Sequence, residues 1–154
     1  MNGLADHDRA AVIRFVRDTL GCGCPDDVFD SMDIGPLPSV AGGRPALQLV
    51  VGGRLLIRLV EPPLPATTAG WLEDLANAGR ATRDARDYNR FRLVLVAPHG
   101  EALPAGLDER FTATVGGDQR AHLHVIAADQ LPATLSVQLA GGPLSSRAGP
   151  SDAK

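Results

Sequence analysis

The segment Ala46-Leu-Gln-Leu-Val-Val-Gly-Gly-Arg-Leu-Leu-Ile-Arg-Leu-Val60 is the stretch that decides the fold. Two apolar runs stand on either side of Gly52-Gly53, and a Gly-Gly pair in this setting is typical of a tight β-hairpin turn. A two-residue loop would pair Val51 with Arg54. Because both faces of such a hairpin carry apolar side chains, we expect it inside a sheet with a helix on at least one side.

The two faces of the predicted hairpin differ in composition. One face would carry Val50, Leu55, Ile57 and Leu59, and the other Leu47, Leu49 and Leu56 together with Arg54 and Arg58. The two arginines would either line a groove or lie at the edge of the sheet. Apolar positions on both faces could also serve a homodimer interface.

The remaining apolar patterns predict the elements around the hairpin. Helices are expected over Asp8–Leu20, in a short segment behind Pro25, from Thr67 or Thr68 to Asp87, and behind Asp129. Strands are expected over Phe91–Ala97 and Ala121–Ala127, whereas residues 107–115 fit a helix or a strand, with the helix favoured.

The resulting element order is α-α-β-β-α-β-(α)-β-α, which predicts the α/β class (an α+β mixed sheet). We expect four or five strands, including the Gly-Gly hairpin, with helices packed on them. Residues 6–139 are expected to form a single domain. The last residues, 140–154, are rich in Gly, Pro and Ser and are expected to form a disordered tail.

Composition limits the possible functions of this 154-residue chain. Among 15 cationic side chains the one lysine is Lys154, which excludes an internal Schiff-base lysine, a P-loop lysine and a nuclease lysine. A net charge of −3 and only 4% aromatic residues argue against nucleic-acid binding. No apolar run approaches the ~20 residues that span a bilayer, and no basic signal region precedes Asp6, so we expect a cytoplasmic protein without membrane contact.

The sharpest chemical motif is Cys22-Gly23-Cys24. Two thiols one residue apart can approach each other or share a soft metal, and a following helix N-terminus would stabilise a thiolate on Cys24. Asp26 and Asp27 oppose that thiolate, and the Cys-x-x-Cys spacing of redox motifs is absent. The pair is therefore either a reactive thiol pair, half of a metal site, or two inert residues at a turn.

The histidines form a second candidate group. His122 and His124 alternate along one predicted strand and therefore share a face, and His99 follows the end of another strand. The three imidazoles could converge on a metal, Zn²⁺ being the candidate, or they could simply lie at an edge of the sheet. No cofactor is otherwise expected.

The arginines form a third candidate group. Arg80, Arg83 and Arg86, with Arg90 and Arg92 just beyond them, could bind a phosphate or a carboxylate. Asp84 and Asp87 interleave with these arginines, so pairing along a solvated helix face explains the same pattern.

The order helix, hairpin, helix, strand resembles the restriction-endonuclease-like core over about half of the chain. In that family the active strand carries an acid-x-lysine signature. The corresponding stretch Leu55–Glu61 has Arg58 and Glu61 but no lysine, so the resemblance implies a catalytically inactive relative.

No catalytic motif of another class is present in the sequence. The sequence therefore favours a small non-catalytic protein that acts by binding, as an accessory subunit or interaction partner of a protein or of a second copy of itself. The alternative is a redox, sulfur-transfer or metal-handling protein that uses Cys22 and Cys24, and whether the protein is an enzyme stays open.

Overall fold

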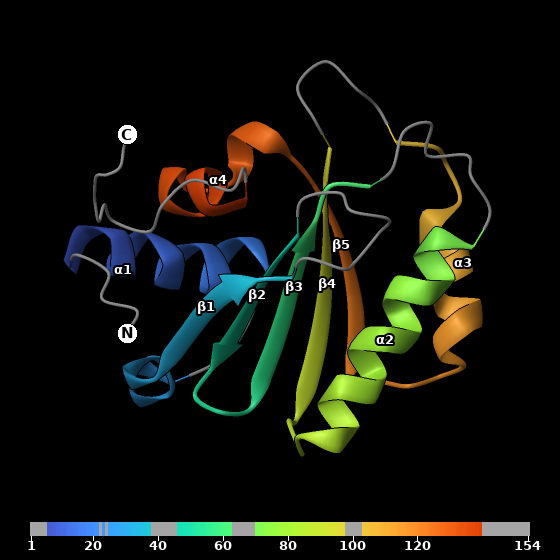
Figure 1. Ribbon diagram of the computed structural model, residues 1–154, viewed down its shortest axis with the longest axis horizontal. Helices are drawn as coiled ribbons and strands as arrows, with labels where there is room; N and C mark the ends of the chain where they lie inside the picture. The colour runs from blue at the N-terminus through green and yellow to red at the C-terminus, as the bar shows by residue number, and fades with distance from the viewer. Residues whose placement is uncertain are drawn as a thin grey trace, which may run out of the picture.

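A five-stranded mixed sheet forms the centre of the protein (Figure 1). The computed structural model describes residues 6–21, 23, 25–37, 46–62, 70–97 and 103–139. The order in the sheet is β1-β2-β3-β4-β5; β1, β2 and β3 pair antiparallel, while β3, β4 and β5 pair parallel. The strands are β1 (Met32–Pro36), β2 (Ala46–Val51), β3 (Leu55–Val60), β4 (Arg90–Ala97) and β5 (Ala121–Ala127). The predicted fold class and mixed sheet are confirmed.

Helices cover both faces of this sheet (Figure 1). The first face packs against α1 (Asp6–Arg14), its π-helical continuation η1 (Phe15–Thr19) and α4 (Ala133–Leu139). The second face packs against α2 (Trp71–Ala85) and α3 (Leu107–Val115), which connect the parallel strands. Two short 3-10 helices, η2 (Asp26–Asp30) and η4 (Ala128–Gln130), precede β1 and α4.

The hairpin forms, but its predicted register is wrong by one residue. Val51 lies opposite Leu55 rather than Arg54, and Gln48 lies opposite Arg58. The loop has three residues because both glycines adopt positive φ, +63° and +66°, and Arg54 N then donates to Val51 O at 3.1 Å. A one-residue change of register exchanges the partners on both faces, so the predicted faces are also corrected.

The observed hairpin faces belong to two separate cores. The six residues of β3 are all buried, with alternate side chains on opposite faces of the sheet. The chain's own helices occupy both hairpin faces, which removes them as the predicted homodimer interface. On the first face lie Leu47, Leu49, Val51, Leu55, Ile57 and Leu59; on the second face lie Ala46, Val50, Leu56 and Val60.

The second face shows why α2 can approach the sheet closely. A Cβ atom on Gly79 of α2 would overlap the ring of Phe91 on β4, so only glycine fits at this helix position. This contact holds α2 against the start of β4, where Arg90 and Arg92 also lie.

Three other elements, α3, β1 and the start of α2, can be compared with the predicted ones. Residues 107–115 form a helix, and β1 was not predicted because Gly35 and Pro36 belong to a stretch interpreted as a loop. The long helix begins at Trp71, with Gly70 as its N-cap. The proposed caps Thr67 and Thr68 and the tail 140–154 lie outside the described residues.

Candidate functional site: a basic pocket beside the sheet

A cavity of about 400 Å³ opens on the first face, where β3 and β4 begin. Three of its lining residues are arginines: Arg54, Arg90 and Arg92. We call this cavity the basic pocket. It is completed by Gly21, Gly23, Pro25, Val28, Leu55 and Asn89.

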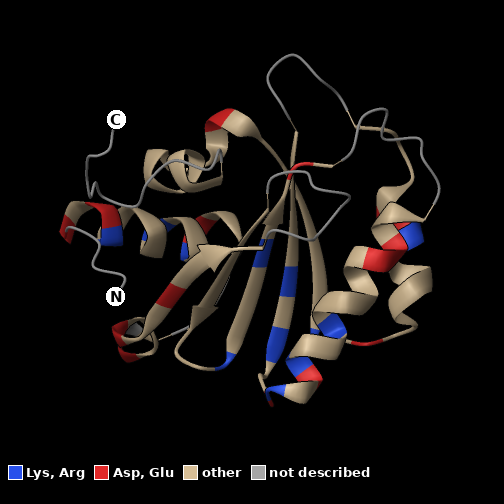
Figure 2. Cartoon of the chain, in the orientation of Figure 1, with Lys and Arg blue, Asp and Glu red and all other residues tan. Residues whose placement is uncertain are grey.

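The parallel pairing of β3 with β4 brings the three arginines together. Arg54 closes the hairpin turn, and its carbonyl accepts hydrogen bonds from Asn89 N at 2.7 Å and from Arg90 N at 3.1 Å. Arg90 and Arg92 then project to the same face because they are two residues apart on one strand. Basic residues accordingly mark the hairpin turn before β3 and the lower part of β4, and neither strand contains an acidic residue (Figure 2).

Arg92 forms the inner part of this pocket and is half-buried, whereas Arg54 and Arg90 are exposed. Arg92 Nη1 donates to His124 Nε2 at 2.9 Å, while the buried Arg92 Nε has no hydrogen-bond partner among the described residues. Burial lowers the pKa of Arg92, and the neighbouring Arg90 charge lowers it further. The Arg92 guanidinium is therefore desolvated and next to a like charge, and a bound anion would relieve both effects.

No carboxylate is among the described residues that line the basic pocket. Within the described part of the chain, the ion pairs also leave out Arg54, Arg90 and Arg92. Asp27, which lies in sequence between the lining residues Pro25 and Val28, is exposed. The described residues of the wall consequently do not neutralise the positive charge of the pocket.

His122 and His124 lie on the first face beside the basic pocket, with His122 opposite Arg92 on the neighbouring strand. Burial, followed by the charge of Arg92, lowers the pKa of His122 and lowers that of His124 to about 4. Because an arginine can only donate, His124 Nε2 accepts and the ring is neutral. A cation at 2.9 Å from Nε2 is a poor setting for a metal ligand.

The metal prediction also included His99, which lies outside the described residues. Among the residues that the structure describes, no group of three or more His, Cys, Asp or Glu side chains could hold a metal ion. The prediction that three histidines converge thus stays untested, and His122 and His124 are grouped instead with Arg92.

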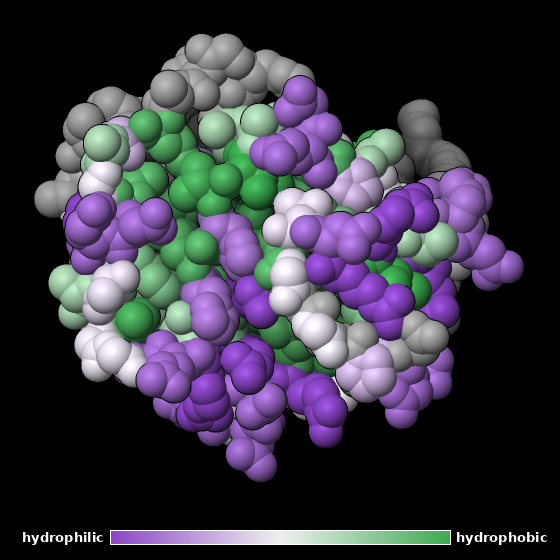
Figure 3. Space-filling view, turned by 180° about the vertical axis from the view of Figure 1, so that it is seen from behind, coloured by the Kyte–Doolittle hydropathy of each residue, from purple (hydrophilic) through white to green (hydrophobic). Residues whose placement is uncertain are grey.

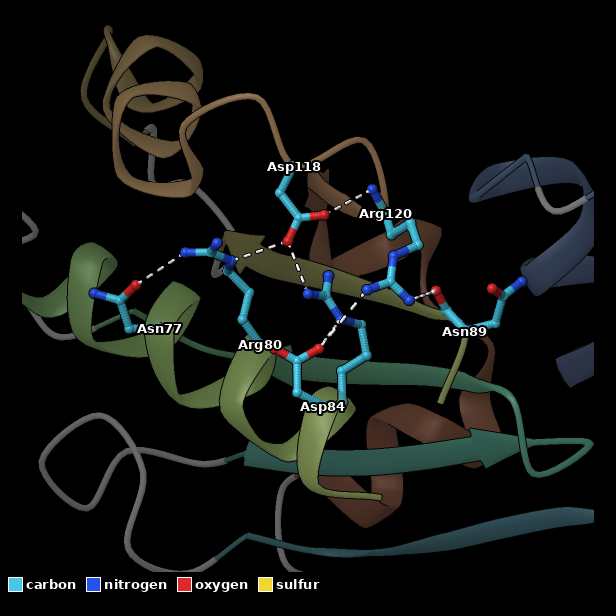
Figure 4. Close-up of polar contacts among 7 residues, drawn as sticks. Asn77, Arg80, Asp84, Asn89, Asp118 and Arg120 are labelled. Atoms are coloured by element: carbon cyan, nitrogen blue, oxygen red, sulfur yellow. Dashed lines mark hydrogen bonds and ion pairs between the residues drawn. The ribbon is translucent and has the colours of Figure 1, made fainter. Parts of the chain in front are cut away.

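Two members of the predicted Arg80, Arg83 and Arg86 group pair with carboxylates, and the contacts around Arg80, Asp84 and Asp118 are drawn in Figure 4. Arg83 Nη2 and Arg80 Nε contact the same oxygen of Asp118, at 2.8 Å and 3.1 Å. Arg83 Nε also contacts Asp84 at 3.0 Å. These four residues, Arg80, Arg83, Asp84 and Asp118, form what we call the paired cluster, and Arg86 stays outside it as an exposed residue.

The paired cluster neutralises its own charge. The Arg83 side chain is 3% exposed and that of Asp118 13% exposed. Although burial opposes it, hydrogen bonds from Arg83, from Arg120 N and from Arg80 lower the pKa of Asp118 to about 2. This arrangement joins α2 to the turn after α3 and favours the interpretation that Arg80 and Arg83 pair with carboxylates over anion binding at the predicted group.

Arg58, the position that the endonuclease resemblance singled out, is buried on the second face. Its guanidinium donates from Nε to Gln48 Oε1 and from Nη2 to Thr82 Oγ1, each at 3.0 Å. These two bonds anchor α2 to the hairpin. Arg58 therefore lies neither in a groove nor at the edge of the sheet, unlike Arg54.

Cys22 and Cys24 lie outside the described residues. Their neighbours Gly21, Gly23 and Pro25 are described and line the basic pocket. Gly23, the middle residue of the motif, thus lies in the wall of the pocket, although sequence reasoning did not connect the motif with Arg54, Arg90 and Arg92. The signal that could have connected them is the order strand, helix, strand from Leu55 to Ala97, because such a unit favours parallel neighbouring strands and would bring Arg54 close to Arg90.

No described helix is long and apolar enough to cross a membrane. Comparison of the chain with protein-family models, with curated proteins and with solved structures finds no match.

Proposed function

We propose that this protein is a cytoplasmic binding protein whose basic pocket holds the anionic group of a ligand, without catalysis of its own. The observation that carries this proposal is the set of three arginines around one cavity without a carboxylate in its described wall. Guanidinium groups bind phosphate and carboxylate oxygens through paired N–H donors, and Arg92 is already desolvated for this task.

The dimensions of the pocket support a small ligand or a single group of a larger one. Its volume of about 400 Å³ falls within the ~300–1,000 Å³ of small-molecule sites. Val28 and Leu55 supply an apolar wall, and Asn89 supplies an amide. A ligand with an anionic group and a compact apolar part would contact all three kinds of wall.

Isothermal titration calorimetry with inorganic phosphate, pyrophosphate and citrate tests this function at low ionic strength. We expect pyrophosphate or citrate to bind with a Kd on the order of 1 mM or below, and Arg92→Gln to weaken binding about tenfold, since one charge-assisted contact contributes ~1.5–3 kcal/mol. Arg86→Gln is the matched control, because it removes an exposed arginine outside the pocket. Equal weakening by both variants, or no binding by the native protein, would contradict the proposal.

Thiol chemistry at Cys22 and Cys24 is the second candidate function. It is favoured by the position of Gly21 and Gly23 in the wall of a basic pocket, because nearby guanidinium charge stabilises a thiolate. Alkylation rates measured against pH, in Cys22→Ser and Cys24→Ser proteins, test this candidate. A thiol pKa well below ~8.5 that rises in Arg92→Gln supports it, and ordinary pKa values for both thiols reject it.

A further inference from the structure

We infer that β5 is a self-association edge, at which it pairs antiparallel with β5 of a second copy about a two-fold axis at His124. This inference does not depend on the basic pocket. It rests on the side chains, the free backbone groups and the symmetry of the strand Ala121–Ala127.

The two edges of the sheet have different protection against further pairing. β1 contains Asp33, Gly35 and Pro36. A charged side chain and a proline on an edge strand both hinder its pairing with a further strand. β5 pairs with β4 on one side only. Its sequence contains no Asp, Glu, Lys or Arg, no proline and no glycine. An unprotected edge strand of seven residues is the kind that accepts another strand.

The direction of the backbone groups along β5 follows from one hydrogen bond. Arg120 O accepts from Phe91 N of β4 at 2.8 Å, so residues 120, 122, 124 and 126 direct their backbone groups toward β4. The odd-numbered residues direct theirs outward. At one end Ala121 N donates to Asp118 O at 3.4 Å, and at the other Ala127 N donates to Gln130 Oε1 at 2.8 Å.

Consequently, the backbone N–H and C=O groups of Leu123 and Val125 point outward and form no hydrogen bond with a described residue. They are placed symmetrically about His124. In an antiparallel pair with Leu123 opposite Val125 of the second copy, each of these residues exchanges two hydrogen bonds with its partner. A shift of register by two residues would require Ala121 N or Ala127 N, both of which already have acceptors.

The side chains agree with this register. Val125 is 47% exposed and would lie beside Leu123 of the second copy, extending the apolar second face. His124 would lie opposite His124 of the second copy on the first face, and both rings are neutral at pH 7. In the view from behind, apolar surface lies mainly above and to the left of the centre, with hydrophilic side chains beside and below it (Figure 3).

A second copy fits this edge better than an unrelated peptide, because the free groups are self-complementary. A two-fold axis at His124 pairs the free groups of Leu123 with those of Val125 in the second copy and places the small Ala121 opposite Ala127 at each end. The absence of net charge within β5 removes the like-charge repulsion that a symmetric pair would otherwise suffer.

Sedimentation equilibrium of the full chain from about 1 to 300 μM, with Val125→Pro as the variant, tests the interface. Proline at Val125 removes an outward N–H and leaves the β4 ladder intact, so it is tolerated at an edge position. We expect the native chain to dimerise and Val125→Pro to raise the dimer dissociation constant at least tenfold. Val137→Lys, which changes an apolar residue of α4 that is 50% exposed, is the control and is expected to dimerise as the native chain does.

A cross-link tests the register separately, in a Cys22→Ser, Cys24→Ser background. His124→Cys would face itself in a non-hydrogen-bonded pair with Cα atoms ~4.5 Å apart, within the range of a disulfide. Val125→Cys would instead face Leu123. We expect a covalent dimer from His124→Cys alone. A native chain that stays monomeric, a dimer unaffected by Val125→Pro, or equal cross-linking by both cysteines would overturn the inference.

Discussion

The two arginine groups of this protein lie on opposite faces of one sheet and differ in what neutralises them. In the paired cluster, Arg80 and Arg83 share the carboxylate of Asp118. In the basic pocket, Arg92 has a neutral histidine as its partner and Arg90 as its neighbour. Arginines thus have different surroundings in the two groups: those of the first join elements of the fold through carboxylates, and those of the second have no carboxylate partner among the described residues.

Breaking the paired cluster should have the largest effect on stability. Asp118→Asn leaves Arg83, 3% exposed, with only Asp84 as a carboxylate partner. Removing one partner of a buried pair costs several kcal/mol, so we expect a loss of about 2–4 kcal/mol in the free energy of unfolding.

Arg92→Gln is the matching change in the basic pocket. It removes a desolvated charge that has no carboxylate partner among the described residues, so unfolding by urea should show a change below about 1 kcal/mol. A loss in Arg92→Gln as large as that in Asp118→Asn would contradict the distinction between the two groups.

Acid should affect the two faces in separate pH ranges. The pKa of His124 is about 4 in the folded protein against 6.5 in the unfolded chain, so the unfolded state binds more protons and stability falls between pH 6.5 and about 4. The pKa of Asp118 is about 2 against 3.8, so its contribution is present above pH 3.8 and is lost as pH falls toward 2. Each step is expected to be on the order of 2–3 kcal/mol, because one pKa unit corresponds to about 1.4 kcal/mol.

Urea unfolding at pH values from 7 to 3 measures the first step and the start of the second. His124→Gln keeps an acceptor for Arg92 and removes the titration, so it should flatten the curve between pH 6.5 and 4 while leaving the decline below pH 4. An unchanged slope between pH 6.5 and 4 in this variant would show that His124 is not the group responsible.

Sequence reasoning predicted the elements better than it predicted their relations. The Gly52-Gly53 turn and the strands at Phe91 and Ala121 follow from local patterns, and these patterns were enough for the fold class. The register was missed because two successive glycines with positive φ permit a three-residue loop as readily as a two-residue one.

The candidate site depended on contacts between distant segments. Asp118 neutralises Arg80 from 38 positions away, and nothing near Arg80 in the sequence indicates it. The pocket likewise requires β3 and β4 to pair in parallel, so that Arg54 meets Arg90. Spacing along the chain therefore grouped Arg90 and Arg92 with Arg80, Arg83 and Arg86, whereas the pairing of strands groups them with Arg54.

Stabilisation of the protein by an anion is expected to be modest. With a Kd near 1 mM, 10 mM pyrophosphate would add about 1.4 kcal/mol to the free energy of unfolding and raise Tm by roughly 3–6 °C. Sodium chloride at matched ionic strength is the reference, because general screening acts on both faces. Arg92→Gln should lose most of this rise and Arg86→Gln should keep it, since only the first removes a guanidinium from the pocket. A rise that survives in Arg92→Gln would place the anion elsewhere, and the two arginine groups would then differ in structure without differing in ligand binding.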